Sequence, residues 1–347
     1  MSIYQEMNKQ AIDIQCIFLC NPRTFDYFKK TENATYLLES KNIIHTLRGI
    51  YHLATSKQII ADNYYGFLAM TTFKPVVKCT QIWHSVGAVK QFGAMDPANA
   101  NRTPGAIRRF KKVYNSFDQF VIGSDMMGLI FKKAMPAPNA IFLKTGVPRT
   151  DFFFDINLHE QIRKNLYAQN PPLKDKKIIL YAPTFRKNEQ MEHSLHLDLE
   201  KMYSTLKDDY ILLIKHHPTS KLALNLDEQW QNFIFDYSSH PNINELLIIT
   251  DVLITDYSSI PMEFIFRKKK MIFYAYDLNN YQLDSGLWED YNASVPGPSV
   301  KNTKALIDAI LDEKVNHEQL DHYRKKWTQY CDGKSSEKLV EYLFSSI

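Results

Sequence analysis

Several signatures of common enzyme classes are missing from this sequence of 347 residues. Its 11 glycines form neither GxGxxG nor GxxxxGK[ST], the loops that hold phosphates in nicotinamide enzymes and P-loop ATPases. The four cysteines show no CxxC or Cys/His metal spacing, which favours a reduced chain in the cytoplasm. No apolar run reaches the roughly 18 residues that span a bilayer, and the start MSIYQEMNKQ predicts no signal peptide.

Composition and charge are typical of a soluble globular protein whose charge is unevenly distributed along the chain. The sequence is 45% apolar and 23% charged, values that are ordinary for such proteins. Its net charge is only +4, yet residues 102–149 hold nine Lys and Arg against two Asp. That local excess of positive charge predicts an anionic partner.

Short apolar segments that read as buried strands alternate with helical patterns. The expected strands cover residues 14–19, 36–38, 58–61, 76–83, 120–122 and 141–143 in the first half, and 178–181, 210–214, 252–255 and 271–274 in the second. Strands of this kind that alternate with helices form parallel sheets. The sequence therefore predicts two α/β domains that face each other across a cleft, an arrangement that suits a nucleotide-binding enzyme.

The expected domain organisation follows the same pattern. Residues 1–150 form the first domain, residues 151–175 the crossing, and residues 176–320 the second domain. The crossing is polar, contains Pro171-Pro172 and ends in KDKK. The helical pattern of residues 321–347 predicts C-terminal helices that could pack back on the first domain.

The stretch from 249 to 266 is the most informative part of the chain. It reads as a strand, a turn at Asp256-Tyr257 and a helix that opens at Ser258-Ser259, with Pro261 in the first turn. The N–H groups expected to be free there are those of Ser259, Ile260 and Met262. Together with the helix dipole they predict an anion site for a phosphate, and an ordinary strand–turn–helix remains the alternative.

Three more polar clusters follow expected strands. They are His84 with Lys90 in WHSVGAVKQFG, Arg186 at the end of YAPTFR, and Lys215-His216-His217 in KHHP. A histidine at a strand end can act as a base beside an anion, although a single histidine is more often structural. Because the carboxyl ends of parallel strands meet at one edge, clusters from one sheet would line a single crevice.

These motifs together resemble the CDP-glycerol glycerophosphotransferases of teichoic acid synthesis, most closely the primase branch. The resemblance covers about residues 76–298 and rests on WHSVGAVKQFG, YAPTFR, KHHP, TDYSSIPMEF, IFYAYDL, GLWEDY and PGP, in that order. It implies a GT-B fold of two Rossmann-like domains, with the donor nucleotide held mainly by the second.

The resemblance also implies roles for individual residues. His84 matches the family's general base, and His217 matches the histidine at the donor phosphates. The implied donor-binding residues are Arg186, Lys215, Ser258, Ser259 and Glu263, with Glu263 at the ribose. Two positions depart from the family pattern: Ser85 replaces the glycine usual in polymerases, which favours a primase, and Ser285 replaces a common arginine, which leaves room for a different acceptor.

The implied reaction transfers glycerol phosphate from CDP-glycerol to an undecaprenyl-diphosphate-linked disaccharide and releases CMP. The sequence has no DxD, and no other acidic pair presents itself as a metal clamp, so we expect no protein-bound metal. We also expect no cofactor and no nucleic acid partner. The implied location is the inner face of the plasma membrane, with the protein peripheral on an anionic surface. Residues 104–117 predict a helix whose basic side could contact that surface or could simply be solvated.

Three other functions remain open at this point. A glycerol- or ribitol-phosphate polymerase would use the same donor chemistry, and a GT-B glycosyltransferase would use a nucleotide sugar. A non-catalytic protein that binds anions or membranes would explain the basic segment. That function would not explain the histidine and serine motifs.

Overall fold

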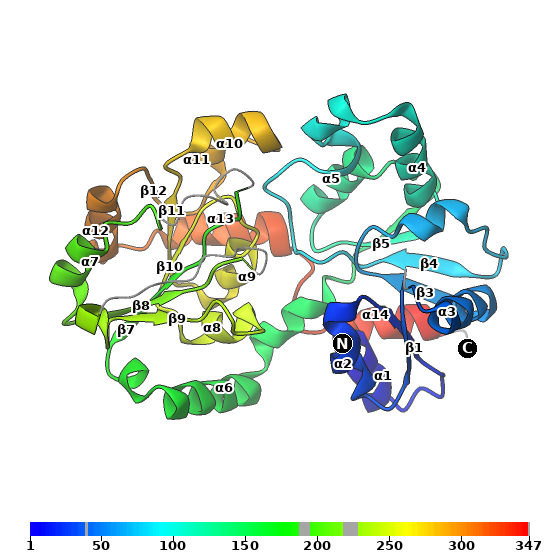
Figure 1. Cartoon of the computed structure of the whole chain (residues 1–347), viewed down its shortest axis with the longest axis horizontal. Coiled ribbons are helices and arrows are strands. Elements are labelled where there is room, and N and C mark those ends of the chain that lie inside the picture. The colour runs from blue at the N-terminus through cyan, green and yellow to red at the C-terminus, as the bar shows by residue number, and fades with distance from the viewer. Residues whose placement is uncertain (39–40, 187–194, 218–227, 346–347) are drawn as a thin grey trace.

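The computed structural model describes residues 1–38, 41–186, 195–217 and 228–345, and Figure 1 shows them as two lobes. The first lobe is built on a sheet of four parallel strands in the order β3-β4-β5-β6. The second is built on six parallel strands in the order β12-β11-β10-β7-β8-β9. The α/β class with parallel sheets is therefore confirmed.

The first lobe combines its main sheet with a small separate one. Its strands are β1 (Ile17–Cys20), β2 (Ala34–Leu37), β3 (Gln58–Ala61), β4 (Lys78–Gln81), β5 (Gln119–Val121) and β6 (Ile141–Leu143). Its helices are α1 (Ser2–Lys9), α2 (Pro22–Lys29), α3 (Ile43–Thr55), α4 (Pro104–Tyr114) and α5 (Asp125–Ala134), with 3-10 turns η1 (Gly66–Met70), η2 (Gly93–Met95) and η3 (Pro97–Asn101). Strands β1 and β2 pair with each other outside the four-stranded sheet, which the sequence pattern did not predict.

The second lobe carries the larger sheet. Its strands are β7 (Lys177–Tyr181), β8 (Tyr210–Ile214), β9 (Ile234–Asp236), β10 (Val252–Thr255), β11 (Lys270–Tyr274) and β12 (Ser299–Val300). Its helices are α7 (Leu199–Leu206), α8 (Ile243–Ile249), α9 (Pro261–Phe264), α10 (Leu278–Ser285), α11 (Tyr291–Ser294) and α12 (Thr303–Leu311), with η7 (Glu228–Trp230) and η8 (Ile265–Arg267). All ten expected strands are present, and the two short strands β9 and β12 were missed.

Helices connect the lobes in both directions. The forward crossing consists of η4 (Pro148–Phe154), α6 (Ile156–Gln169) and η5 (Pro171–Lys174), and α6 packs on α8 of the second lobe. At the C-terminal end, α13 (His317–Thr328) contacts both α5 and α9, and α14 (Ser335–Phe344) packs on α1. Both chain termini therefore lie in the first lobe (Figure 1).

The strand order of the second lobe places a switch point between β7 and β10. The chain moves from β7 to β8 and β9 on one side, and then returns to β10 on the other side of β7. In parallel α/β sheets, ligands bind at the carboxyl ends of the strands beside such a point. Three of the four predicted clusters follow β7, β8 and β10, which are neighbours, so the fold brings them to one edge.

Candidate active site

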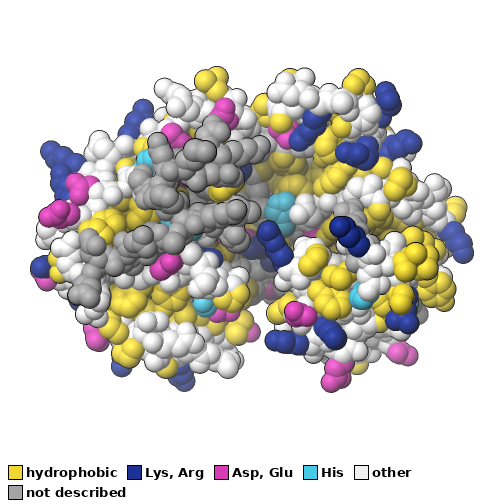
Figure 2. All heavy atoms as spheres, viewed as in Figure 1, with side chains coloured by type: hydrophobic (Ala, Val, Ile, Leu, Met, Phe, Trp, Pro, Cys, Tyr) yellow, Lys and Arg dark blue, Asp and Glu magenta, His cyan; other side chains and the backbone are white. Residues whose placement is uncertain are grey.

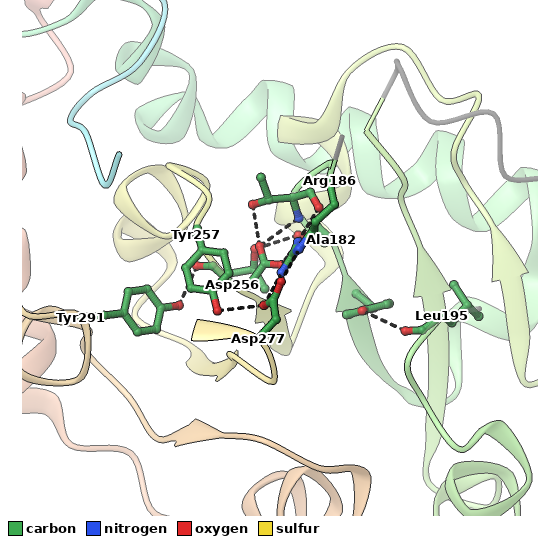
Figure 3. A network of polar contacts seen from close by, with 10 residues as sticks. Ala182, Arg186, Leu195, Asp256, Tyr257, Asp277 and Tyr291 are labelled. Carbon is green, nitrogen blue, oxygen red and sulfur yellow. Dashed lines mark hydrogen bonds and ion pairs between the residues drawn. The ribbon is translucent and has the colours of Figure 1, made fainter. Parts of the chain in front are cut away.

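Asp256 is the centre of the turn that follows β10. Its side chain is 2% exposed, and its Oδ1 accepts hydrogen bonds from the backbone N–H and hydroxyl of Thr184, at 2.8 and 2.5 Å. The hydroxyl of Tyr291 donates to the Asp256 carbonyl oxygen at 2.8 Å. Figure 3 shows how these contacts hold the turn after β10 against the segment after β7. The carboxyl ends of the two strands are thus fixed together at the switch point.

Arg186 is held inside this network. Its Nη1 lies 2.6 Å from Oδ2 of Asp256, and its Nε and Nη2 each lie 2.9 Å from an oxygen of Asp277 (Figure 3). The guanidinium carbon also lies 5.2 Å from the ring centre of Tyr257, whose hydroxyl donates to Asp277. The two carboxylates raise the Arg186 pKa against the opposing effect of burial. Since both charges already face it, donor binding by Arg186 stays a prediction.

The segment Ser258-Ser259 is not the helix start that the sequence predicts. Helix α9 begins at Pro261, two residues later, and is only four residues long. The Ile260 N–H is taken by Oγ of Ser258 at 3.2 Å, and the Met262 N–H by the Ser259 carbonyl at 3.0 Å. The expectation of free N–H groups is therefore wrong for Ile260 and Met262, because oxygens of the two serines accept their hydrogen bonds.

Ser258 nevertheless borders a pocket to which both lobes contribute. The pocket is lined by Val89 from the first lobe and by Asp256, Ser258 and Trp288 from the second. Both serines are half-buried. Any contact of a phosphate with this turn would accordingly rely on the hydroxyl of Ser258 and on nearby cations more than on a helix dipole.

The cluster after β8 divides into two buried residues and an exposed one. Lys215 is 7% exposed and its Nζ donates to the Ser238 carbonyl at 2.7 Å, while His216 is also 7% exposed. His217 is exposed, and crowding by protein atoms, then the charges of Lys90 and Lys215, lower its pKa. This difference favours His217 over His216 for contact with a ligand. Pro218, the last residue of that motif, lies outside the described residues.

His84 lies in the segment that follows β4 of the first lobe. The side chain is exposed but crowded by protein, and this desolvation lowers its pKa, as does the charge of Arg149, while a hydrogen bond to the Asp62 backbone acts in the opposite direction. A histidine of lowered pKa is neutral near pH 7 and can accept a proton. Its Trp83 neighbour has a φ of 57°, a backbone conformation that is strained for a bulky residue.

Glu263 is paired with Arg149, which lies in η4 at the start of the crossing between the lobes. It is 5% exposed, and its oxygens lie 2.7 Å from Nε and 3.1 Å from Nη2 of Arg149 in η4. Burial raises the Glu263 pKa, and the Arg149 charge opposes that shift. Nη1 of Arg149 also donates to the His84 carbonyl. Arg149 thereby joins the backbone of His84 to Glu263, and a ribose contact of Glu263 stays a prediction.

The segment from His84 to Gln91 is bonded to the second lobe. The Gln91 N–H donates to the Gly286 carbonyl at 3.2 Å, and the Trp288 N–H donates to the Val89 carbonyl at 3.1 Å. Gly286 has a φ of 62°, a conformation that favours glycine, and a Cβ there would lie 2.6 Å from Oε1 of Gln91. These bonds tie the segment that follows His84 to residues 286–288, which follow α10 in the second lobe.

Gly87 explains how closely this segment packs. A Cβ at Gly87 would lie 2.4 Å from the Trp327 ring and 2.6 Å from the sulfur of Met262. Both neighbours are side chains, one from α13 and one from α9. A larger residue would have to push the segment away from the second lobe.

Lys90 brings a positive charge from the first lobe to the second. Its Nζ lies 6.0 Å from the ring centre of Tyr281, and desolvation lowers its pKa while the charge of Asp256 raises it. The sequence analysis noted Lys90 as part of a motif, but it could not predict which residues Lys90 lies near in the fold. The same holds for Arg149, which lies 65 residues from His84 and 114 from Glu263.

Comparison with known proteins assigns the family. A model of the family CDP-Glycerol:Poly(glycerophosphate) glycerophosphotransferase matches residues 1–345. The chain belongs to this family. The resemblance inferred from the motifs is thus confirmed.

Curated relatives include both primases and polymerases. The teichoic acid glycerol-phosphate primase of Bacillus subtilis is 38% identical over 89% of this chain and 78% of its own. The teichoic acid poly(ribitol-phosphate) polymerase of Bacillus spizizenii is 36% identical over 91% of this chain, which spans 50% of that relative's length. The ribitol-phosphate polymerase TarK of Staphylococcus aureus is 32% identical over 99% of this chain and 64% of its own.

Solved structures show the same fold at lower identity. The wall teichoic acid polymerase TagF matches with a TM-score of 0.82 and 23% identity, over 99% of this chain and 84% of the solved one. The MnaA–UDP structure from S. aureus matches with a TM-score of 0.59 and 14% identity, over 100% and 93% of the two chains. At these identities the likeness describes the fold alone.

Proposed function

We propose that this protein transfers glycerol phosphate from CDP-glycerol to a lipid-linked N-acetylmannosaminyl-N-acetylglucosamine disaccharide, as a teichoic acid primase. In this proposal the two lobes form a GT-B arrangement, with the donor in the second lobe and the acceptor in the first. The carrying observation is that the segment with His84 is bonded to the second lobe beside the turn that holds Ser258. This contact supports a site to which His84 from the first lobe and Ser258 from the second both contribute.

The proposed step is an in-line displacement at phosphorus. A sugar hydroxyl oxygen of the acceptor attacks the phosphorus that bears glycerol, His84 takes the hydroxyl proton, and CMP leaves with the electrons of the broken P–O bond. A base of this kind contributes about 10²–10⁴-fold in rate. The lowered pKa of His84 supports this role, since only the neutral ring can accept the proton.

The proposed donor site lies at the carboxyl edge of β7, β10 and β8. His217, Ser258 and Ser259 would contact the pyrophosphate, and Lys90 would add a cation from the first lobe. Buried Lys215 would contribute positive charge, Arg186 would hold the segment after β7 at the donor through its two carboxylates, and Glu263 would hold the ribose. Because charge develops on the pyrophosphate oxygens in the transition state, donors fixed in place there lower the barrier. The proposal needs no protein-bound metal, so EDTA should leave turnover unchanged.

The primase assignment is tested by supplying three kinds of donor and two acceptors. Calorimetry with CDP-glycerol, CDP-ribitol and UDP-sugars should show binding of CDP-glycerol with the highest affinity. Turnover should then require the unprimed lipid disaccharide. A preference for the glycerol-phosphate-primed acceptor would make the protein a polymerase, and preferred binding of a UDP-sugar would make it a glycosyltransferase.

A location at the inner face of the plasma membrane is supported by two surfaces of the first lobe. Helix α3 exposes Ile43, Ile44, Leu47, Ile50 and Tyr51 along one side. Helix α4 exposes four cations, Arg108, Arg109, Lys111 and Lys112. The apolar face of α4 packs inward on η1, so its predicted bilayer contact is reduced to the basic side. Figure 2 shows hydrophobic side chains together with Lys and Arg on this lobe. Among the described residues no helix is long and apolar enough to cross a bilayer.

Vesicle sedimentation tests this surface. Each cation near an anionic leaflet contributes about 1 kcal/mol, so reversing the four α4 cations to Glu should release the protein from phosphatidylglycerol vesicles. The matched control reverses four exposed lysines of the second lobe, Lys201, Lys301, Lys304 and Lys314, and should stay bound. Equal binding of both variants would contradict the α4 contact.

A further inference from the structure

A second pocket lies wholly within the first lobe. It has a volume of about 180 Å³, and most of its lining is aromatic: Tyr64, Trp83, Phe92, Phe110, Tyr114 and Phe117. A single water needs only about 10–15 Å³ of such volume, so the pocket is large enough for an organic group. None of the residues assigned to the donor borders it.

This pocket adjoins the proposed base. The Trp83 ring lies 4.2 Å from the His84 ring, centre to centre, and stacks on Phe92 at 4.8 Å. Phe92 in turn meets Trp288, which borders the pocket with Ser258, at 6.0 Å. A row of aromatic rings therefore runs from this pocket to the one that Ser258 borders, with His84 beside Trp83.

The polar groups of the pocket favour an uncharged ligand. Arg102 is paired with Asp96 at 3.1 Å and lies over Phe110 at 4.8 Å, so its charge is neutralised. The hydroxyl of Tyr64 is buried and has no hydrogen-bond partner among the described residues. A buried hydroxyl without a partner is costly, and a ligand that bonds to it would remove that cost.

We infer that this pocket holds the sugar ring of the acceptor that carries the attacking hydroxyl. The inference rests on the proposed function and specifies where its acceptor binds. The C–H faces of a sugar ring pack as apolar surface on aromatic rings, and its hydroxyl or acetamido groups can bond to Tyr64. A diphosphate would find no net positive charge here, and an isoprenoid chain would leave the Tyr64 hydroxyl unpaired.

Steady-state kinetics with a short-chain lipid disaccharide tests the site. Phe110→Ala and Tyr64→Phe should each raise the acceptor KM about fivefold to tenfold, the scale of one aromatic contact or one hydrogen bond. The KM for CDP-glycerol should change less than twofold. Tyr27→Phe, at a residue 56% exposed on α2, is the matched control and should change neither constant. If Phe110→Ala lowers the melting temperature so far that the variant is not folded in the assay, the acceptor KM of Tyr64→Phe tests the site.

A direct binding measurement distinguishes the proposal of a sugar-binding pocket from the proposal of the transfer reaction. The methyl glycoside of the disaccharide, without donor, should bind the parent protein and lose affinity in Tyr64→Phe. Binding without any transfer from CDP-glycerol would retain the pocket and overturn the proposed function. Transfer with an unchanged acceptor KM in both pocket variants would overturn the pocket and retain the function. Equal competition by a polyprenyl phosphate without sugar would also overturn the inference, since it would make the occupant the lipid chain.

Discussion

The two lobes differ in how fully their sheets are buried. Strands β8 and β10 of the second lobe are buried along their whole length, and β7 and β11 are buried at all but their first residue. In the first lobe, β1 is half-buried except at its last residue, and β2 is half-buried throughout. Strand ends in a fully packed sheet hold their side chains in fixed positions. The proposed donor site therefore lies in the lobe whose sheet is more fully buried, and the proposed acceptor site lies in the other lobe.

The site residues follow the same division. In the second lobe Arg186 is bound by two carboxylates, and Asp256 accepts four hydrogen bonds at its side chain and carbonyl. In the first lobe His84 and Lys90 are both exposed and lie on one connecting segment. Removing His84 should therefore impair chemistry more than donor affinity, whereas removing Lys90 should affect the donor as well, and the following changes test that division.

The largest effect is expected for His84→Ala. Loss of the base should reduce turnover by about 10²–10⁴-fold, while the affinity for CDP-glycerol stays within a few-fold. Because the side chain is exposed, the melting temperature should hardly change. His322→Ala, an exposed histidine on α13, is the control. Near-normal turnover in the folded variant would remove His84 from the mechanism, and lost donor affinity would move it to the nucleotide site.

The next effect is expected at the Arg149–Glu263 pair, which joins the lobes. Breaking a buried ion pair typically costs about 3–5 kcal/mol, but the Arg149 side chain is 39% exposed, so we expect about 1–3 kcal/mol for Arg149→Met. Turnover should fall as well, since the His84 backbone loses its anchor.

A double-mutant cycle isolates this pair. Glu263→Gln alone should weaken CDP-glycerol binding, and combining it with Arg149→Met should recover part of the lost stability because no unpaired charge is then buried. Arg149→Lys should restore charge but not the forked contact to both Glu263 and His84. Additive losses in the double variant would show that the two side chains act independently.

Lys90→Met should produce a smaller change in kcat/KM, because Lys90 belongs to the first lobe but is proposed to contact the donor held by the second. Loss of a charge-assisted contact with the donor phosphates should lower kcat/KM about tenfold to a hundredfold. Lys78→Met, an exposed lysine at the start of β4, serves as the control. An unchanged kcat/KM in Lys90→Met would restrict the donor site to the second lobe.

The smallest effect is expected from pH. His84 and His217 both have a pKa below the ordinary 6.5, so the unfolded chain binds more protons than the folded one as pH falls through 6.5. Their contribution to stability is therefore full above pH 6.5 and declines below it. Activity should stay high at pH 6.5 and fall at lower pH, as His84 gains a proton. Melting curves of His217→Asn should depend less on pH in this range, and an unchanged dependence would contradict the shift.

Much of the fold follows from local pattern. Runs such as residues 210–214 and 252–255 are apolar on both faces, which only the middle of a parallel sheet accommodates, and both are strands of the second lobe. Strand β12 was missed because two residues carry no periodicity, and β9 was missed although β5 and β6 are equally short and were predicted. The helix after Ser258 was placed two residues too early, since a serine hydroxyl can close a turn as well as cap a helix.

The sequence by itself determined the chemical inventory of this protein: the motifs, their order at strand ends and the family to which they belong. Only the tertiary structure decided the partners of these residues. Arg149 meets Glu263 across 114 positions, and Arg186 meets Asp277 across 91. Such pairs depend on how two sheets and their connecting helices pack. A local sequence pattern cannot predict that packing, because the same residue type can face a ligand in one fold and a buried charge in another.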